Sequence, residues 1–293
     1  MTIKGSIDFI IPAHNEAATV AAVSSACVRA CEEITGLCTV TVVADHCTDG
    51  TEEQAKASRA MVVSRTDGQP SKSQAVQDGV RSTTGDIVAL FDADCLGLSS
   101  DHILGLIRPV AERRVDLSVG VIDYGRILTP IVQRYPWSSG QRVVRRDGFD
   151  WDDARLCGYS LEMVMNESIG LAQGVTYSTV LEGVRHISKY RKLRGSGSFI
   201  GNFHMWKSIA ESMKDISAEG ISAYFDGVRL RDAYEETKRP VMPSEIGTAA
   251  MWLGCQVLRS EAVANTTRSL LASSLSRAPV ALNEVSHRHR VHQ

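Results

Sequence analysis

The feature that most constrains this chain is a series of short apolar segments separated by longer, more polar ones. The apolar segments are rich in valine and isoleucine and nearly free of polar alternation, which is typical of strands buried on both faces. We expect strands at residues 7–11, 40–44, 61–63, 87–91 and 117–121. We expect helices at 16–31, 51–58, 71–82 and 99–113. This alternation predicts an α/β fold with a mostly parallel, Rossmann-like sheet flanked by helices.

The second half of the chain is less regular. A helix is expected at residues 158–170, a strand at 176–181 and another helix at 198–213. A basic loop with several glycines spans 185–197, and one or two further helices with a frayed tail are expected after residue 243.

Composition excludes several classes of protein. A chain of 293 residues with 43% hydrophobic residues suits one large domain with a small appendage, and its net charge of −2 gives no reason to expect nucleic acid as a partner. No apolar run approaches the roughly 20 residues of a membrane-spanning helix. The nearest, residues 246–258, is interrupted by glycine, threonine and glutamine, and suits dimer packing or contact with a membrane surface.

The seven cysteines are scattered, without a Cys-x-x-Cys pair. An odd number, no evident disulfide framework and no signal peptide favour a reducing cytoplasm, with the cysteines as small core residues. Their spacing gives no support for a zinc site. A glycine-rich dinucleotide fingerprint and a Walker motif are also missing, which disfavours dehydrogenases and P-loop nucleotidases. Any phosphate would have to be held by a metal and by side chains.

Polar clusters follow the expected strands, where ligands of parallel sheets bind. Asp92 and Asp94 follow the strand at 87–91 and can share a face, so that together they can hold Mg²⁺ or Mn²⁺. The alternative is a chance Asp-x-Asp in which Asp94 caps a turn. Asp45 follows the strand at 40–44 and can accept hydrogen bonds from a ribose or a base, while Asp49 and Thr51 suit a turn and a helix cap.

Two further clusters have both a structural and a functional interpretation. Asn15 and Glu16 suit the N-terminus of the first helix as a cap and a dipole-matched carboxylate. Lys72 begins the helix at 71–82, where Ser71 and Gln74 fit a capping box. Lys72 can meet a phosphate or a base, or can be a solvated surface lysine.

Glu162 lies between leucine and methionine in an apolar helical segment. A carboxylate in such surroundings suits a general base, or it can orient a hydroxyl group. Asp152 and Asp153 are the alternative bases.

Taken in order, these clusters resemble glycosyltransferase family 2, whose members have the GT-A fold. The matching segments are 9–16 (FIIPAHNE), 43–45 (VAD), 48–51 (TDGT), Lys72, 85–94 (GDIVALFDAD), 140–142 (GQR), 158–162 (GYSLE) and 183–186 (GVRH). The later segments are most similar to those of dolichyl-phosphate-mannose-synthase-like and glucosyl-3-phosphoglycerate-synthase-like members. The resemblance covers about residues 6–215.

The resemblance implies a role for each cluster. Donor-binding residues would be Pro12, Ala13, Glu16, Asp45, Lys72, Asp92, Ala93, Arg185 and Arg191, the two arginines belonging to a basic loop that clamps the diphosphate. Metal ligands would be Asp92, Asp94 and His186. Catalytic residues would be Glu162 and Asp94. Acceptor-binding residues would be Gly140, Gln141 and Arg142, with Arg142 suited to an anionic acceptor.

We therefore expect a cytoplasmic enzyme that uses Mg²⁺ or Mn²⁺; attachment to a membrane surface and homodimer formation are both compatible with the sequence. It would transfer a sugar from a nucleoside-diphosphate donor, uridine being favoured over guanosine, to a small hydroxylated or phosphorylated acceptor. The expected regions are a nucleotide-sugar-binding half at 1–125, an acceptor-binding half at 126–240 and a C-terminal helical extension at 241–293. Alternatives are a polyprenyl-phosphate acceptor at the membrane surface, nucleotidyl transfer, and non-catalytic binding of a sugar nucleotide.

Overall fold

The computed structural model describes residues 1–3, 5–124, 126, 128–186 and 213–230, all within one compact unit, Met1–Pro243. At its centre lies an eight-stranded sheet in the order β10-β8-β6-β7-β4-β1-β2-β3. Its strands are β1 (Ile7–Ala13), β2 (Cys38–Asp45), β3 (Met61–Arg65), β4 (Ile87–Leu90), β6 (Leu117–Ile122), β7 (Gln141–Arg145), β8 (Thr176–Leu181) and β10 (Val228–Leu230). A second, two-stranded sheet pairs β5 (Cys95–Leu96) with β9 (Arg185–His186).

The sheet is mostly parallel, which confirms the predicted fold class. Within the described part of the chain, β7 is the strand that runs antiparallel to its neighbours, β4 and β6. All other neighbouring strands of the large sheet are parallel. The five strands expected in the first half are all present, as is the strand at 176–181. Strands β1, β4 and β6 are buried almost throughout, as their apolar sequences predict, whereas β3 lies at the end of the sheet and is partly exposed.

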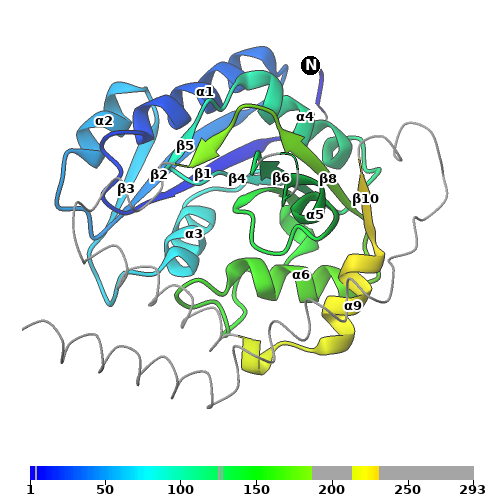
Figure 1. Cartoon of the computed structure of the whole chain (residues 1–293). Coiled ribbons are helices and arrows are strands. Elements are labelled where there is room, and N and C mark those ends of the chain that lie inside the picture. Colours follow the sequence, from blue (N-terminus) through cyan, green and yellow to red (C-terminus); the bar gives the residue numbers. More distant parts are fainter. Residues whose placement is uncertain (4, 125, 127, 187–212, 231–293) are drawn as a thin grey trace, which may run out of the picture. The chain divides into compact units, whose positions relative to one another are not determined.

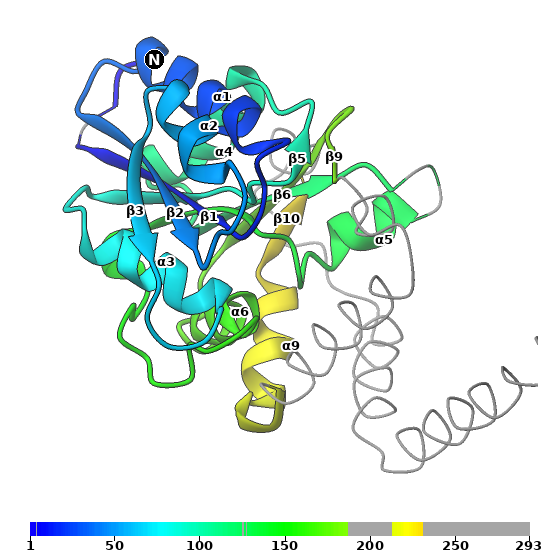
Figure 2. The same cartoon turned by 90° about the vertical axis from the view of Figure 1, so that its left-hand side faces the viewer.

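Helices cover both faces of the sheet, with α1, α2 and α4 on one face and α3 and α6 on the other (Figure 1). Figure 2 shows the same layers edge-on. The helices are α1 (Val20–Glu33), α2 (Thr51–Ala57), α3 (Lys72–Arg81), α4 (Ser100–Ala111), α5 (Leu128–Arg134), α6 (Leu161–Leu171) and α9 (Ala218–Asp226). Two short 3₁₀ turns occupy Arg146–Gly148 and Met213–Asp215. The aromatic rings of Phe9 and Phe91 stack in the core under α1 and α4, with their centroids 6.1 Å apart.

The start of the first helix differs from the prediction. Helix α1 begins at Val20, and its N-cap is Thr19 rather than Asn15. Asn15 instead has a left-handed backbone, with φ of 56°, and its side-chain oxygen accepts a hydrogen bond from the Thr48 amide at 2.8 Å. The segment 14–19 is therefore a loop. Asn15 does not cap the helix but joins this loop to the loop after β2 through its hydrogen bond with Thr48.

The expectation that all cysteines are unpaired core residues is wrong. Cys31, near the end of α1, forms a disulfide with Cys38 at the start of β2. Cys157 is exposed, Cys47 is half-buried, and Cys27 and Cys95 are buried. The pairing escaped the sequence argument because the seven-residue separation resembles no disulfide framework, whereas the turn between α1 and β2 brings the two residues together.

The described residues contain no helix long and apolar enough to cross a membrane. The helix expected at 198–213 and the C-terminal extension from 241 lie outside the described residues, apart from Met213. The proposed division into regions stays a prediction.

Candidate functional site

The candidate site lies where β1, β2 and β4 end and α3 begins. Parallel pairing of these strands brings the Asp45 and Asp92 segments to one edge of the sheet, as expected from the carboxyl-end rule. The α3 N-terminus reaches the same edge because Ser71, its N-cap, donates its backbone N–H to Asp45 Oδ2 at 2.7 Å. The predicted capping box is therefore only half formed. Ser71 Oγ accepts a hydrogen bond from the backbone N–H of Gln74. The backbone N–H of Ser71, however, donates to Asp45 and not to the side chain of Gln74.

Lys72 joins two of the predicted site residues. Its Nζ lies 2.6 Å from Asp92 Oδ1 and 2.6 Å from Glu162 Oε1. Burial of the ammonium group lowers its pKa, but the charges of Asp92 and Glu162 outweigh burial and hold the pKa of Lys72 above its ordinary value. The surface interpretation of Lys72 is wrong, because its side chain is about four-fifths buried between two carboxylates.

Asp92 is held in its charged form by its neighbours. Burial raises its pKa, whereas Lys72, His186 and the hydrogen bond from Gln141 lower it, and the net effect is a pKa below the usual range. Gln141 Nε2 donates to Asp92 Oδ2 at 3.2 Å. A Cβ on Gly140 would lie closer to the Asp92 carboxylate than real Cβ contacts allow. Gly140 and Gln141 thus shape the position of Asp92.

The predicted contact of Arg142 with an anionic acceptor is contradicted by its burial. Arg142 is fully buried, and its guanidinium bonds to the carbonyl of Ser139 at 2.6 Å and to Asn166 Oδ1 at 2.7 Å. It also donates to the carbonyls of Pro136 and Trp137. Arg142 therefore ties β7 to α6 and to the segment before β7. Gln141 is likewise fully buried and bonds inside the protein, which argues against acceptor contact.

His186 reaches the Asp92–Asp94 segment through the small sheet. Strands β5 and β9 are antiparallel, and the residue after Asp94 pairs directly with His186. His186 Nε2 lies 4.0 Å from Asp92 Oδ2 and 3.9 Å from Asp94 Oδ1. This buried nitrogen has no hydrogen-bond partner among the described residues. Two carboxylates and an unpaired imidazole nitrogen are ligands that suit a divalent cation.

Asp45 is already strongly hydrogen-bonded. Its Oδ1 accepts from Arg65 Nη1 at 2.6 Å and lies 2.7 Å from His46 Nδ1. Asp45 and Arg65 are direct partners in the β2–β3 register, which explains their contact. The sequence argument missed Arg65. An arginine at the carboxyl end of the neighbouring parallel strand was the available signal.

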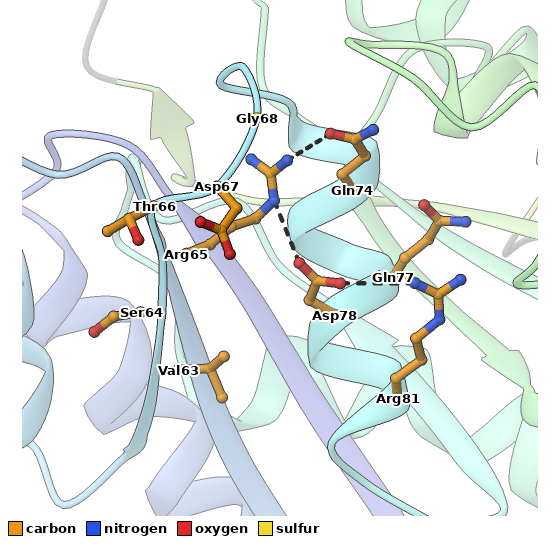
Figure 3. A pocket seen from close by; sticks show the side chains of 10 residues that line it. All are labelled: Val63, Ser64, Arg65, Thr66, Asp67, Gly68, Gln74, Gln77, Asp78 and Arg81. Atoms are coloured by element: carbon orange, nitrogen blue, oxygen red, sulfur yellow. Dashed lines mark hydrogen bonds and ion pairs between the residues drawn. The ribbon is translucent and has the colours of Figure 1, made fainter.

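Arg65 also lines a pocket of about 470 Å³ between β3 and α3 (Figure 3). There its guanidinium bonds to Gln74 Oε1 and to Asp78. The remaining lining residues are Val63, Ser64, Thr66, Asp67, Gly68, Gln77 and Arg81. Because the cations here are matched by carboxylates, the pocket has no evident anion-binding site, and Arg65 serves mainly to hold Asp45 and α3 in place.

The remaining predicted donor residues surround this edge. Ala13 and Ala93 are buried and Pro12 and Glu16 are half-buried, in or after β1 and β4. The Glu16 amide donates to Thr51 Oγ1 at 2.8 Å, which joins the loops after β1 and β2. Arg185 is exposed on β9. Arg191 and the other basic residues of its loop lie outside the described residues.

Tyr159 was also missed as a site residue. It precedes α6 and lies close enough to Lys72 for the two to interact electrostatically. Burial raises the pKa of its phenol, although Lys72 opposes that shift. Its position within a matching segment, 158–162, was the available signal.

Comparison with known proteins gives a family match. The sequence profile described as "Glycosyl transferase family 2" matches residues 8–159. A search of curated protein sequences gives no significant match.

Solved structures of similar fold include glucosyl-3-phosphoglycerate synthase from Mycobacterium tuberculosis. Its complex with phosphoglyceric acid is 21% identical, with a TM-score of 0.56, over 72% of this chain and 79% of that one. Its complex with Mn²⁺, UDP-glucose and phosphoglyceric acid is 20% identical, with a TM-score of 0.55, over 72% and 80% of the two chains. These structures share the fold, and the family profile covers slightly more than half of this sequence. The chain belongs to glycosyl transferase family 2.

Proposed function

We propose that this chain transfers a sugar from a nucleoside-diphosphate sugar, with uridine favoured over guanosine, to a small hydroxylated or phosphorylated acceptor, with the help of Mg²⁺ or Mn²⁺. The observation that carries the proposal is the meeting of Lys72, Asp92, Asp94, Glu162 and His186 at one edge of the sheet. These residues come from distant parts of the chain, and the buried His186 Nε2 has no hydrogen-bond partner among the described residues, as expected of a nitrogen that can bind a metal.

The donor would lie over the ends of β1 and β2. Pro12, Ala13 and Glu16 would border its nucleoside, and Asp45 would accept a hydrogen bond from the base. Arg65 and His46 contact Asp45 Oδ1, and the Ser71 amide donates to Oδ2, so Asp45 would offer a remaining lone pair to the base. The UDP-glucose in a solved structure of similar fold supports uridine.

Asp92, Asp94 and His186 would hold the metal, whose positive charge stabilises the departing diphosphate. Lys72 places a second positive charge beside Asp92, and Arg185 and Arg191 would add to it. Ala93 would lie against the donor.

Glu162 is bound by Lys72 through Oε1. This contact favours a role in orienting a hydroxyl of the sugar or the acceptor, and makes Lys72 and Glu162 act as a pair. A small acceptor is supported by the phosphoglyceric acid in the solved structures of similar fold. Because Arg142 is buried, it would act by joining β7 to α6, and Gly140 would act through Asp92.

Thermal unfolding in the presence of nucleotides tests the donor. We expect UDP with Mn²⁺ or Mg²⁺ to raise the melting temperature, and GDP, CDP or TDP to raise it less, because a ligand stabilises the state that it binds. The shift should require the metal. No shift with any nucleotide would contradict the proposed function.

Asp94→Asn tests the metal site. The variant should lose the metal-dependent part of the UDP shift and most of the sugar transfer, measured with UDP-glucose and a panel of phosphorylated and lipid-phosphate acceptors. Asp101→Asn, an exposed carboxylate in the first turn of α4, is the matched control. Full activity of Asp94→Asn would refute the metal-dependent reaction, and transfer only to the lipid phosphate would refute the small acceptor.

A further inference from the structure

Cys95 lies at the centre of the metal-binding geometry, although it has no place in the proposed reaction so far. Cys95 and His186 are directly opposed in the antiparallel β5–β9 pair, so their side chains share one face of the small sheet. The Cys95 sulfur, a carboxylate oxygen of Asp94 and a ring nitrogen of His186 all lie within 4.8 Å of one another. Three groups at these separations can converge on one ion with small side-chain movements.

The Cys95 thiol belongs to the hydrophobic core but also borders polar groups, which include Gln141 and Asp94. Cys95 is only 1% exposed, yet Gln141 Nε2 donates a hydrogen bond to its sulfur at 2.9 Å. An N–H donor beside a ligating group is a typical outer contact that orients a metal ligand. His186 Nε2, on the opposing strand, is buried without a hydrogen-bond partner among the described residues. Both groups therefore suit ligands better than packing.

We infer that Cys95 is a metal ligand together with Asp94 and His186, so that the site that would use Mg²⁺ or Mn²⁺ in the reaction also binds thiophilic divalent ions such as Zn²⁺, Co²⁺ or Cd²⁺. On binding, a sulfur–metal bond forms and the thiol proton passes to solvent. Sulfur, imidazole and carboxylate together are a zinc-type ligand set, whereas Mg²⁺ prefers oxygen ligands. The inference rests on the proposed function only for the location of the metal.

The sulfur can be detected independently of catalysis. Co²⁺ bound by a thiolate gives an intense near-ultraviolet charge-transfer band that oxygen and nitrogen ligands do not give. We expect this band when Co²⁺ is added to the reduced full-length chain. Cys95→Ser should lose the band and bind Zn²⁺ at least about tenfold more weakly, while its affinity for Mg²⁺ should change little. Cys157→Ser, which removes an exposed thiol, should retain the band.

A second measurement avoids reliance on a variant that can fail to fold. X-ray absorption of the wild-type chain with one equivalent of Zn²⁺ should show a zinc–sulfur distance of about 2.3 Å, together with shorter nitrogen or oxygen distances. A zinc environment of nitrogen and oxygen alone would overturn the role of Cys95.

The outcomes separate the inference from the proposed function. If Asp94→Asn abolishes Co²⁺ binding but the wild-type chain lacks the thiolate band, the metal site stands and Cys95 is not a ligand. If the band persists in Cys95→Ser, another cysteine supplies it and the inference fails. If Co²⁺ binds equally well to wild type and Asp94→Asn, the metal site of the proposed function fails as well.

Discussion

The ammonium nitrogen of Lys72 lies 2.6 Å from Asp92 Oδ1 and so joins the start of α3 to the end of β4. The two residues are 20 positions apart in the sequence, with Lys72 at the start of a helix and Asp92 just after a strand. Their contact puts a fixed positive charge beside the proposed metal ligands. Because Glu162 on α6 contacts the same ammonium group, Lys72 also links α3 to α6.

Replacing Lys72 with methionine should damage both stability and activity. The change leaves two largely buried carboxylates without their cation, which costs about 3 kcal/mol in the free energy of unfolding. Loss of a positive charge beside the leaving diphosphate should lower kcat about 100-fold. Urea unfolding and steady-state kinetics check both. Lys56→Met, which removes an exposed ion pair with Glu52, should change stability by less than about 1 kcal/mol. Equal effects of the two substitutions would contradict the bridging role.

Gly140→Ala should impair activity because the added methyl group collides with the Asp92 carboxylate. A displacement of a site residue by about 1 Å can cost about 100-fold in rate. The matched control is Gly105→Ala on α4, where a Cβ would meet nothing within 4 Å. That helical substitution should raise the free energy of unfolding by about 0.5–1 kcal/mol without affecting the rate. Unchanged kinetics in Gly140→Ala would show that Asp92 can move without consequence.

Arg65→Lys should weaken nucleotide binding through Asp45. Lysine keeps the charge but cannot bond at once to Asp45, Gln74 and Asp78 as the guanidinium does. We expect the Kd for UDP to rise about tenfold, which calorimetry would measure. Arg59→Lys, at an exposed pair with Glu32, should leave the Kd unchanged. If Arg65→Lys binds UDP as tightly as wild type, the position of Asp45 does not depend on Arg65.

Asp49 should make the folded state sensitive to acid. Burial raises the pKa of Asp49, but the hydrogen bonds from Thr51 and from the Ala17 amide together outweigh burial, so its folded pKa lies below the ordinary value. A lowered carboxyl pKa stabilises the folded state above about pH 4, and this contribution is lost as the pH falls through the folded pKa. The stability difference between wild type and Asp49→Asn should therefore be largest near pH 7 and shrink towards pH 2. Urea unfolding across this range measures it, and a difference that grows in acid would contradict the assignment.

The Cys31–Cys38 disulfide should stabilise the chain by about 2–3 kcal/mol, since it closes a short loop between α1 and β2. Thiol titration of the unfolded, unreduced protein should find two thiols fewer than after reduction. Cys31→Ser with Cys38→Ser should lower the free energy of unfolding, whereas Cys157→Ser should not. An equal number of thiols before and after reduction would show that the bond does not form in the purified protein.

Much of the fold could be predicted because the relevant signals are local. Continuous valine- and isoleucine-rich segments mark β1, β2 and β4, and the residues at the carboxyl ends of these parallel strands fall at one edge of the sheet. Asp45 and Asp92 were placed correctly at that edge for this reason. Strand β7 was missed because its arginines, Arg142 and Arg145, resemble a polar surface segment, although Arg142 is buried through bonds to distant carbonyl groups.

The sequence by itself determined the order of strands and helices, the edge at which the polar clusters meet, and the membership of the family. Tertiary structure decided which side chains touch. Cys95 and His186 are separated by 91 positions, and only the β5–β9 pairing makes them neighbours. Cysteine spacing had given no support for a thiol–metal site, because local spacing carries no information on pairing between strands that are distant in the chain. Contacts between side chains that are distant in the sequence form only when the strands that carry them are paired, and the packing of the folded chain decides that pairing.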